Sequence, residues 1–161
     1  MFVTKGSKIR QLLAYIVKKH PNVSITGLMK LSYIVDLVSI GKGRPQISDF
    51  KYVRYNYGPF SQTIYNYIEA LVSDNIIRED SQMASTGDEF IVYNFNKRSK
   101  VVFDKLNKQE IDIIDEVLES LEGYGAKALT ELAYRTKPMK KIGATLENRK
   151  GLNQPLDLHA T

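Results

Sequence analysis

The chain has 161 residues with a formal net charge of +5, and 43% of them are hydrophobic. A chain of this length can bury about 70% of its unfolded surface in a single domain, so it needs no disulfide or metal to fold. The sequence contains no cysteine, which excludes disulfides, thiolate nucleophiles and thiolate metal ligands and is typical of a cytoplasmic protein.

No apolar run approaches the ~18 residues of a membrane span. The N-terminal segment MFVTKGSKIRQLL also lacks the uninterrupted apolar core of a signal peptide. We therefore expect a soluble, unprocessed protein that has no membrane partner.

The charge is unevenly distributed along the chain. Residues 1–60 contain ten Lys or Arg and two acids (+8), residues 61–122 contain six and thirteen (−7), and residues 123–161 contain seven and three (+4). Such polarity fits nucleic-acid contact, a charged protein partner or internal complementarity, and it also fits ordinary solvated faces. Charge alone leaves these alternatives open.

Two helices are predicted at the start of the chain. Apolar residues at helical spacing follow a potential Ser7 cap, and the pattern stops at His20 and the proline after it. A second helix opens near Ser24 or Thr26 and closes at Gly41, which we expect to adopt the left-handed conformation that ends many helices.

Residues 44–60 are ambiguous. The segment YVRYNY alternates between two sets of side chains, which favours a strand, and a Gly-Pro step follows it directly. Ser48 and Asp49 could instead cap a short helix. We favour the strand because β-branched and aromatic residues are dense here.

A third helix is predicted from a Ser61 N-cap to about Asp74, with Phe60 packed on Tyr65 at its start. The runs NIIRED and EFIVYNF, joined by the polar loop SQMASTGD, then predict a β-hairpin. Helix, helix, strand, helix and hairpin is the element order of a winged-helix-like domain.

Two further helices follow. Asn107 and Glu110 form a capping-box pair before a helix that ends at Gly123, and a shorter helix around Leu129 must stop before Pro138. The sequence thus predicts an α+β, mainly α fold: a winged-helix-like helical domain with a small antiparallel β-sheet and two additional C-terminal helices. We expect residues 1–142 to form a single domain and residues 143–161 a C-terminal tail or extended arm.

No catalytic, metal or cofactor site is predicted. The histidines, His20 and His159, lie beside a helix-ending proline and near the C-terminus, where we expect surface side chains and no fixed general base. The acids of residues 110–119 lie along one helix, as on a solvated face, and GKGRP lacks the spacing of a phosphate-binding loop. We therefore expect a protein that is not an enzyme.

A DNA-binding, winged-helix-like transcriptional regulator is the second interpretation, but the charges argue against the usual docking on duplex DNA. The outward side of the third helix carries Gln62 and Asn66 without a Lys or Arg, and the predicted hairpin is acidic. Phosphate contacts normally dominate affinity for DNA. The candidate nucleic-acid-binding residues are the cations upstream of that helix: Lys30, Lys42, Arg44 and Lys51.

Four segments resemble one known family. They are MKLSYIVDL (29–37), GRPQIS (43–48), YVRYNYGPFSQTIYNYIEAL (52–71) with the NII that follows, and LTELAYRTKPMKK (129–141). Over about residues 24–141 the chain resembles the Panacea domain, the SocA-like antitoxin family, also known as phage-associated proteins. The resemblance implies a non-enzymatic type II antitoxin that neutralises a cognate protein toxin by binding it directly.

Nine positions match the family pattern: Lys30, Leu31, Tyr33, Asp36, Tyr55, Tyr57, Gly58, Pro59 and Tyr65. Tyr134 and Met139 depart from it, because the family more often shows histidine and tryptophan there. A role that depended on that histidine is therefore not implied for this chain.

The candidate partner-binding residues combine rings with charged or hydroxyl groups: Tyr33, Asp36, Tyr52, Arg54 and Tyr55. From the alternation of the predicted strand we expect Tyr55 and Tyr57 to face inward, and Tyr52 and Arg54 to face a partner. The expected partner is a protein toxin, with nucleic acid second and a homo-oligomer left open. The tail is a further segment that could order on a partner.

Overall fold

A computed structural model describes residues 7–160 of the chain. In chain order its elements are α1 (Lys8–Lys19), α2 (Ile25–Gly41), β1 (Val53–Tyr55), β2 (Gly58–Phe60), α3 (Thr63–Ser73), β3 (Ile77–Met83), β4 (Glu89–Phe95), α4 (Lys108–Ser120), α5 (Ala126–Tyr134) and α6 (Lys137–Lys141). The predicted α+β, mainly α class is confirmed. The strands form two separate antiparallel pairs, and no helix within residues 7–160 has the length and apolar character needed to cross a membrane.

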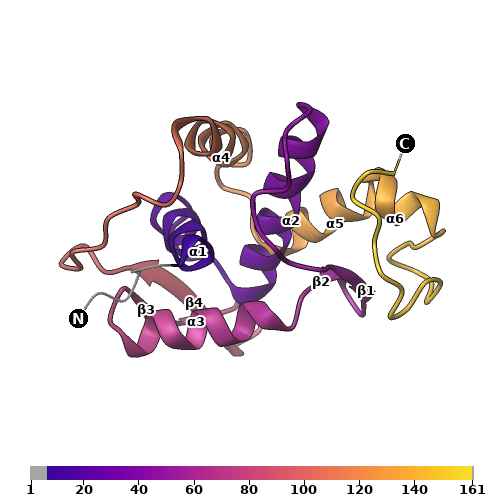
Figure 1. Ribbon diagram of the computed structural model, residues 1–161. Coiled ribbons are helices and arrows are strands. Elements are labelled where there is room, and N and C mark those ends of the chain that lie inside the picture. The colour runs from indigo at the N-terminus through magenta and orange to yellow at the C-terminus, as the bar shows by residue number, and fades with distance from the viewer. Residues whose placement is uncertain (1–6, 161) are drawn as a thin grey trace.

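Helix α2 runs through the centre of the molecule, and α1, α4 and α5 pack around it (Figure 1). Its side chains Leu28, Leu31 and Val35 are fully buried. The predicted caps of the first two helices are confirmed: Ser7 Oγ accepts from the Arg10 amide, and Ser24 Oγ accepts from the Gly27 amide. Local capping and a central apolar helix therefore establish the core.

The predicted end of α2 was wrong in one detail. Gly41 is the last helical residue, and Gly43 takes the left-handed conformation with φ +78°. The amide of Gly43 donates to the Ile40 carbonyl, and the amide of Arg44 donates to the Ser39 carbonyl. Carbonyls of the last helical turn are thus hydrogen-bonded to amides that follow the helix, and the chain reverses at Gly43.

The predicted strand within residues 44–60 is present as β1, and no helix capped by Ser48 forms. The Gly-Pro step does not end the segment, because Gly58 and Pro59 begin the antiparallel partner β2. Gly58 has φ +102°, and a Cβ there would lie 3.3 Å from the Tyr134 ring. The positive φ therefore favours glycine here, and the close approach of the Tyr134 ring leaves little room for a Cβ.

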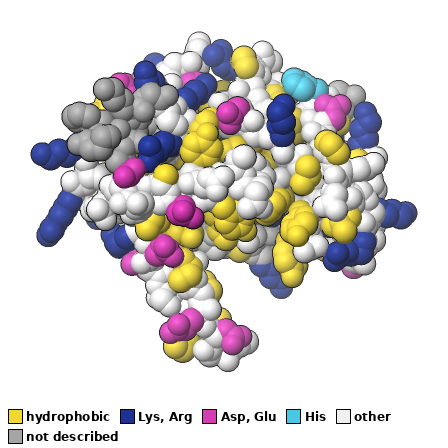
Figure 2. Space-filling model, turned by 60° about the horizontal axis from the view of Figure 1, so that its bottom comes forward, with side chains coloured by type: hydrophobic (Ala, Val, Ile, Leu, Met, Phe, Trp, Pro, Cys, Tyr) yellow, Lys and Arg dark blue, Asp and Glu magenta, His cyan; other side chains and the backbone are white. Residues whose placement is uncertain are grey.

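Helix α3 begins at Thr63, and Gln62 occupies the N-cap position that the sequence predicts for Ser61. Ser61 Oγ instead pairs with Thr63 Oγ1, within a turn that precedes the helix. The β3–β4 hairpin is confirmed, with Ile77 opposite Phe95 and Met83 opposite Glu89. It projects from the body as a narrow lobe that carries acidic and hydrophobic side chains (Figure 2). The winged-helix likeness stays a prediction.

The capping box of Asn107 and Glu110 at the start of α4 is confirmed. Helix α5 ends before Pro138, as predicted, but the short helix α6 was not predicted. Proline is favourable in the first turn of a helix, where its missing amide has no partner to lose. Pro138 therefore both excludes a longer α5 and starts α6.

Residues 143–160 form an arm that returns along β1 (Figure 1). The amide of Arg54 donates to the Gln154 carbonyl over 2.9 Å, and the amides of Asn153 and Leu156 donate to the carbonyls of Arg54 and Tyr52. β1 therefore has hydrogen-bonded neighbours on both sides. The arm lies against the body without a partner chain, whereas the predicted domain boundary near residue 142 stays a prediction.

The side chain of Arg54 fastens the arm. Its guanidinium is 1% exposed and donates to the carbonyls of Thr145 and Asn148, over 3.1 and 2.8 Å, and to the carbonyl of Tyr55. The ring of Tyr134 lies 5.4 Å from the guanidinium carbon. A single cation thus joins β1, α5 and the arm.

We expect Arg54→Met to lower the free energy of unfolding by about 3 kcal/mol, because buried carbonyls lose a charged donor. Amide hydrogen exchange across residues 143–160 should rise at the same time. Chemical denaturation and exchange mass spectrometry measure the two effects.

Arg149→Met is the matched control, since Arg149 is exposed and donates to the Asn56 side chain. Its effect should stay within about 0.5 kcal/mol. Unchanged protection of the arm in Arg54→Met would contradict the role given to the guanidinium.

Candidate functional site

A buried carboxylate on α2 holds the loop that leads into β1. Asp36 Oδ1 accepts from the amides of Ile47 and Ser48, over 3.1 and 2.9 Å. Its Oδ2 accepts from the hydroxyls of Ser48 and Tyr52, over 2.5 and 2.9 Å, and from the Gln46 side chain. Five donors therefore converge on one fully buried carboxyl group.

Burial shifts the pKa values of the ionisable groups in and beside this network. Burial raises the pKa of Asp36, although its hydrogen bonds oppose that change. Burial and the adjacent Asp36 carboxyl raise the pKa of Tyr52 well above its ordinary value, so its hydroxyl stays a donor. Burial also raises the pKa of Tyr33 to about 12, and its ring packs edge-on against Tyr52. The network acts as a structural clamp.

The predicted facing of residues 52–57 was wrong. Tyr52 and Arg54, expected to face a partner, are 2% and 1% exposed, whereas Tyr55 and Tyr57, expected inside, are 41% and 70% exposed. The arm covers Arg54, the Tyr52 hydroxyl reaches Asp36, and Tyr57 lies in the turn between β1 and β2. Alternation separates the two sets of side chains but does not say which set a distant segment will cover.

Most of the candidate partner-binding residues are therefore inaccessible. Tyr33 and Asp36 are buried in the clamp, like Tyr52, and Arg54 lies beneath the arm. Partner contact through Tyr55 stays a prediction.

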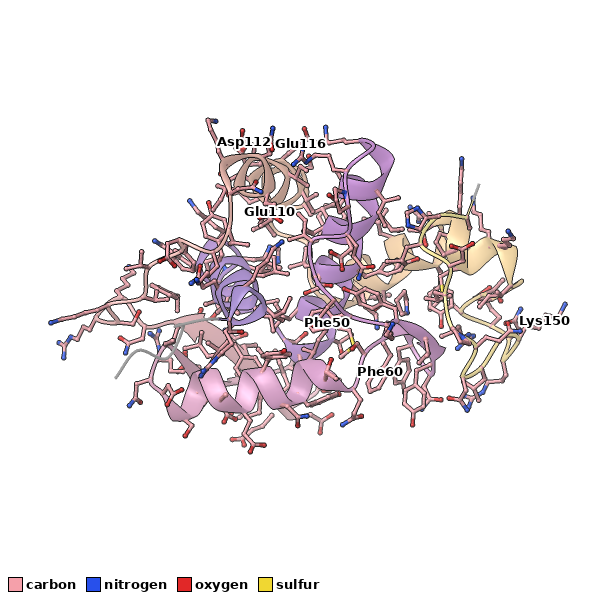
Figure 3. All side chains as sticks on the ribbon, viewed as in Figure 1. Phe50, Phe60, Glu110, Asp112, Glu116 and Lys150 are labelled. Atoms are coloured by element: carbon pink, nitrogen blue, oxygen red, sulfur yellow. The ribbon has the colours of Figure 1, made fainter. Side chains whose placement is uncertain are left out.

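Three rings form an exposed aromatic ridge: Tyr55, Phe60 and Tyr65. The Tyr55 and Phe60 centroids are 4.7 Å apart, and those of Phe60 and Tyr65 are 5.9 Å apart, which confirms the predicted packing of Phe60 on Tyr65. Figure 3 shows Phe60 where β2 meets α3. Tyr55 and Tyr65 remain 41% and 42% exposed. The ridge presents apolar ring surface that ends in hydroxyl groups.

A groove of about 800 Å³ adjoins the ridge, and Phe60 belongs to both. Val53, Tyr67 and Ala70 add apolar surface to it, while Arg10, Asp49 and Lys51 contribute charged groups. We call it the α3 groove. Figure 2 shows the corresponding face, where hydrophobic side chains gather across the middle of the molecule. Sequence analysis missed the groove, because its walls come from α1, α3 and the segment before β1.

The candidate nucleic-acid-binding residues do not form one surface. Lys30 is buried and donates to the Pro59 carbonyl over 3.0 Å, so it cannot reach a phosphate group. Lys42 pairs with Glu116 on α4, and Arg44 donates to the Gln109 side chain. Lys51 lies in the α3 groove. The prediction for Lys30 was wrong because α2 turns this lysine toward β2.

Residues 7–160 contain no group of three or more His, Cys, Asp or Glu side chains arranged to hold a metal ion. His20 is buried, contrary to the expectation of a surface side chain, and its Nε2 lies 2.9 Å from the Tyr124 carbonyl oxygen. His159 is exposed, as expected.

Lys30 should make stability depend on pH. Burial lowers its pKa from 10.5 to about 8. Between these pH values the unfolded chain binds more protons, so the free energy of unfolding rises with pH, by about 2 kcal/mol between pH 7 and about pH 9.5. The destabilisation that comes from burying the charged Lys30 side chain is fully present below pH 8. We expect Lys30→Met to lack this rise, as measured by urea denaturation at both pH values.

Lys51→Met, which removes an exposed lysine, is the control and should follow the wild-type pH dependence. If Lys30→Met also follows the wild type, the lysine is not desolvated as the structure describes.

Comparison with known proteins places this geometry in a family. The model of the family described as antitoxin SocA-like, Panacea domain, matches residues 28–138. No curated protein and no solved structure matches the chain. The matched range contains the Asp36 network, Lys30 and the whole aromatic ridge, and it covers well over half of the chain. This protein therefore belongs to the SocA-like antitoxin family and carries its Panacea domain.

Proposed function

We propose that this protein is the antitoxin of a type II toxin-antitoxin system and neutralises a cognate protein toxin by direct binding, without catalysis of its own. The observation that carries the proposal is the aromatic ridge beside the α3 groove, within the range that matches an antitoxin family. Tyr55, Phe60 and Tyr65 supply the kind of surface that a folded partner covers.

The chemistry of the ridge fits a protein partner. Tyrosine and arginine are enriched among the residues that dominate the energy of protein interfaces, and they act best around a desolvated centre. Tyr55 and Tyr65 flank Phe60, and the adjoining groove offers Val53 and Tyr67 for an inserted side chain. Charged groups at Asp49 and Lys51 can then form the polar rim.

The structure behind the ridge supports binding without rearrangement. Asp36 fixes the loop before β1, and Arg54 fixes β1 against the arm. A surface held from both sides loses little conformational freedom when a partner covers it. Three buried ionisable groups have hydrogen-bond partners within the fold: Asp36, Arg54 and Lys30.

Co-expression tests the function directly. We expect the product of the adjacent gene to arrest growth when expressed alone and this chain to restore growth by forming a complex that co-purifies with it. Growth arrest that persists despite soluble expression of the chain would contradict the proposal.

Variants of the ridge test the site. Tyr55→Ala with Tyr65→Ala should weaken toxin binding at least about 30-fold, because dominant interface rings contribute about 2 kcal/mol or more. Isothermal titration with the purified toxin measures the change, and thermal denaturation checks the fold.

Tyr124→Ala is the matched control, since its ring is 39% exposed and lies between α4 and α5, away from the ridge. It should bind the toxin as the wild type does. Equal losses in the control and the ridge variant would show that the ridge is not the site.

A further inference from the structure

The C-terminal end of the molecule carries a concentrated positive charge. Between residues 134 and 160 the chain contains six cations and two acids, Glu147 and Asp157, a net charge of +4. All six cations are exposed: Arg135, Lys137, Lys140, Lys141, Arg149 and Lys150. We call them the basic end. The ion pairs within residues 7–160 involve other cations, so no acid neutralises these six directly.

The two parts of the basic end are held side by side. Met139 of α6 is fully buried and packs with Tyr134 and Ala144 in a small apolar cluster. A Cβ on Gly143 would lie 3.5 Å from Lys150 Cδ, so the stem of Lys150 crosses the chain just beyond α6. Lys150 of the arm therefore lies beside the end of α6, while Arg149 reaches the Asn56 side chain between β1 and β2.

This surface is presented on a fixed backbone. Arg54 binds the carbonyls of Thr145 and Asn148, on the segment that leads to Arg149. The Asn148 side chain binds the Gly143 carbonyl and the amides of Thr145 and Lys150. The arm is thus a folded loop whose cations keep their spacing.

Most of the negative charge lies elsewhere on the molecule. Figure 3 shows Lys150 at the outer edge of the arm, whereas Asp112 and Glu116 lie on α4. Figure 2 shows several Lys and Arg side chains and an acidic one towards the right-hand edge, where α6 and the arm lie in Figure 1, and a group of acids on the hairpin lobe. A polyanion approaching this end meets an excess of positive charge over the exposed Glu147 and Asp157.

We propose that the basic end binds the phosphate backbone of duplex DNA. Phosphate contacts need exposed cations and little apolar surface, and this end offers six cations while the aromatic ridge lies on β1, β2 and α3. An acidic protein partner would also use apolar surface, which at this end lies in the cleft that Leu37, Ile40 and Leu158 line beside Arg135 and Lys137. The site replaces the upstream cations that the sequence suggests, among which Lys30 is buried and Lys42 is paired.

Binding at this end is independent of base sequence. Helix α6 has five residues, which are too few to read a major groove of DNA. The outward side chains Gln62 and Asn66 line the α3 groove of the protein and do not belong to the basic end. Affinities typical of backbone binding, about 10⁻⁴ to 10⁻⁶ M at physiological salt, follow. Lys140, Lys141, Arg149 and Lys150 also lie beyond the residues that match the family.

Fluorescence anisotropy with a mixed-sequence duplex of about 20 base pairs, at several salt concentrations from 50 to 200 mM, tests the proposal. The logarithm of affinity should fall linearly with the logarithm of salt concentration, by about 0.9 per phosphate neutralised. Lys140→Gln with Lys141→Gln should reduce the magnitude of that slope by about 2. A second duplex of unrelated sequence should bind equally.

Lys97→Gln with Arg98→Gln is the matched control, because it removes the same charge from exposed residues of the loop between β4 and α4. Its slope should equal that of the wild type. Equal effects of the two double variants would overturn the assignment of the site, and absence of salt-dependent binding would overturn the proposal. Tighter binding of single-stranded DNA, RNA or polyglutamate would overturn the choice of duplex DNA.

The ridge variant Tyr55→Ala with Tyr65→Ala separates this proposal from the proposed function. It should bind the duplex as the wild type does, since no ridge ring belongs to the basic end. A large loss of DNA affinity in this variant would overturn the separation of the two surfaces.

Discussion

Both surfaces of the molecule depend on the hydrogen bonds that the buried guanidinium of Arg54 donates. A buried cation is costly unless strong partners replace its water. Arg54 finds carbonyl oxygens and the face of Tyr134 instead of a carboxylate, and its Nε keeps no partner. These carbonyls belong to the arm, so satisfying the charge forces the arm onto β1. One constraint thus orients the ridge and places the basic end.

Asp36 plays the complementary role on the other side of β1. The loop from Gly43 to Tyr52 forms neither a helix nor a strand, so its amides need other acceptors. The carboxyl group supplies them for Ile47 and Ser48, and it also orders the hydroxyl of Tyr52. A buried polar group that is fully satisfied specifies one arrangement of the surrounding chain. The segment that leads to the ridge is therefore fixed by the Asp36 carboxyl group of α2 and by the Arg54 guanidinium within β1.

Interactions between residues close in the sequence made much of this fold predictable. The caps at Ser7, Ser24 and Asn107 act within one turn, and the helical periods needed no knowledge of distant contacts. Helix α6 escaped because five residues carry no period and Pro138 usually indicates an end. The family resemblance identified the segments that matter, yet it did not say which of their side chains are covered.

The candidate site was less predictable, because it depends on segments far apart in the chain. Arg54 and Lys30 are cations, and residue type alone suggests exposure. The arm that covers Arg54 follows some 90 residues later, at Thr145 and Asn148. Asp36 and the arm together cover the face of Tyr52 and Arg54, and a change of facing inverts every side chain of a strand. Which of these side chains are buried is therefore decided by contacts between segments that lie far apart in the chain.

The two surfaces rely on different forces, and this difference lets one small domain carry both. A partner on the ridge would bury ring surface, an effect that salt weakens little, whereas the proposed DNA contact would act through charges that salt screens within about 10 Å. β1 connects them: Tyr55 points to the ridge, while the neighbouring Arg54 holds the arm. A partner that covers the ridge need not displace a cation of the basic end. Successive residues of one short strand therefore support the two proposed binding surfaces by pointing to opposite faces.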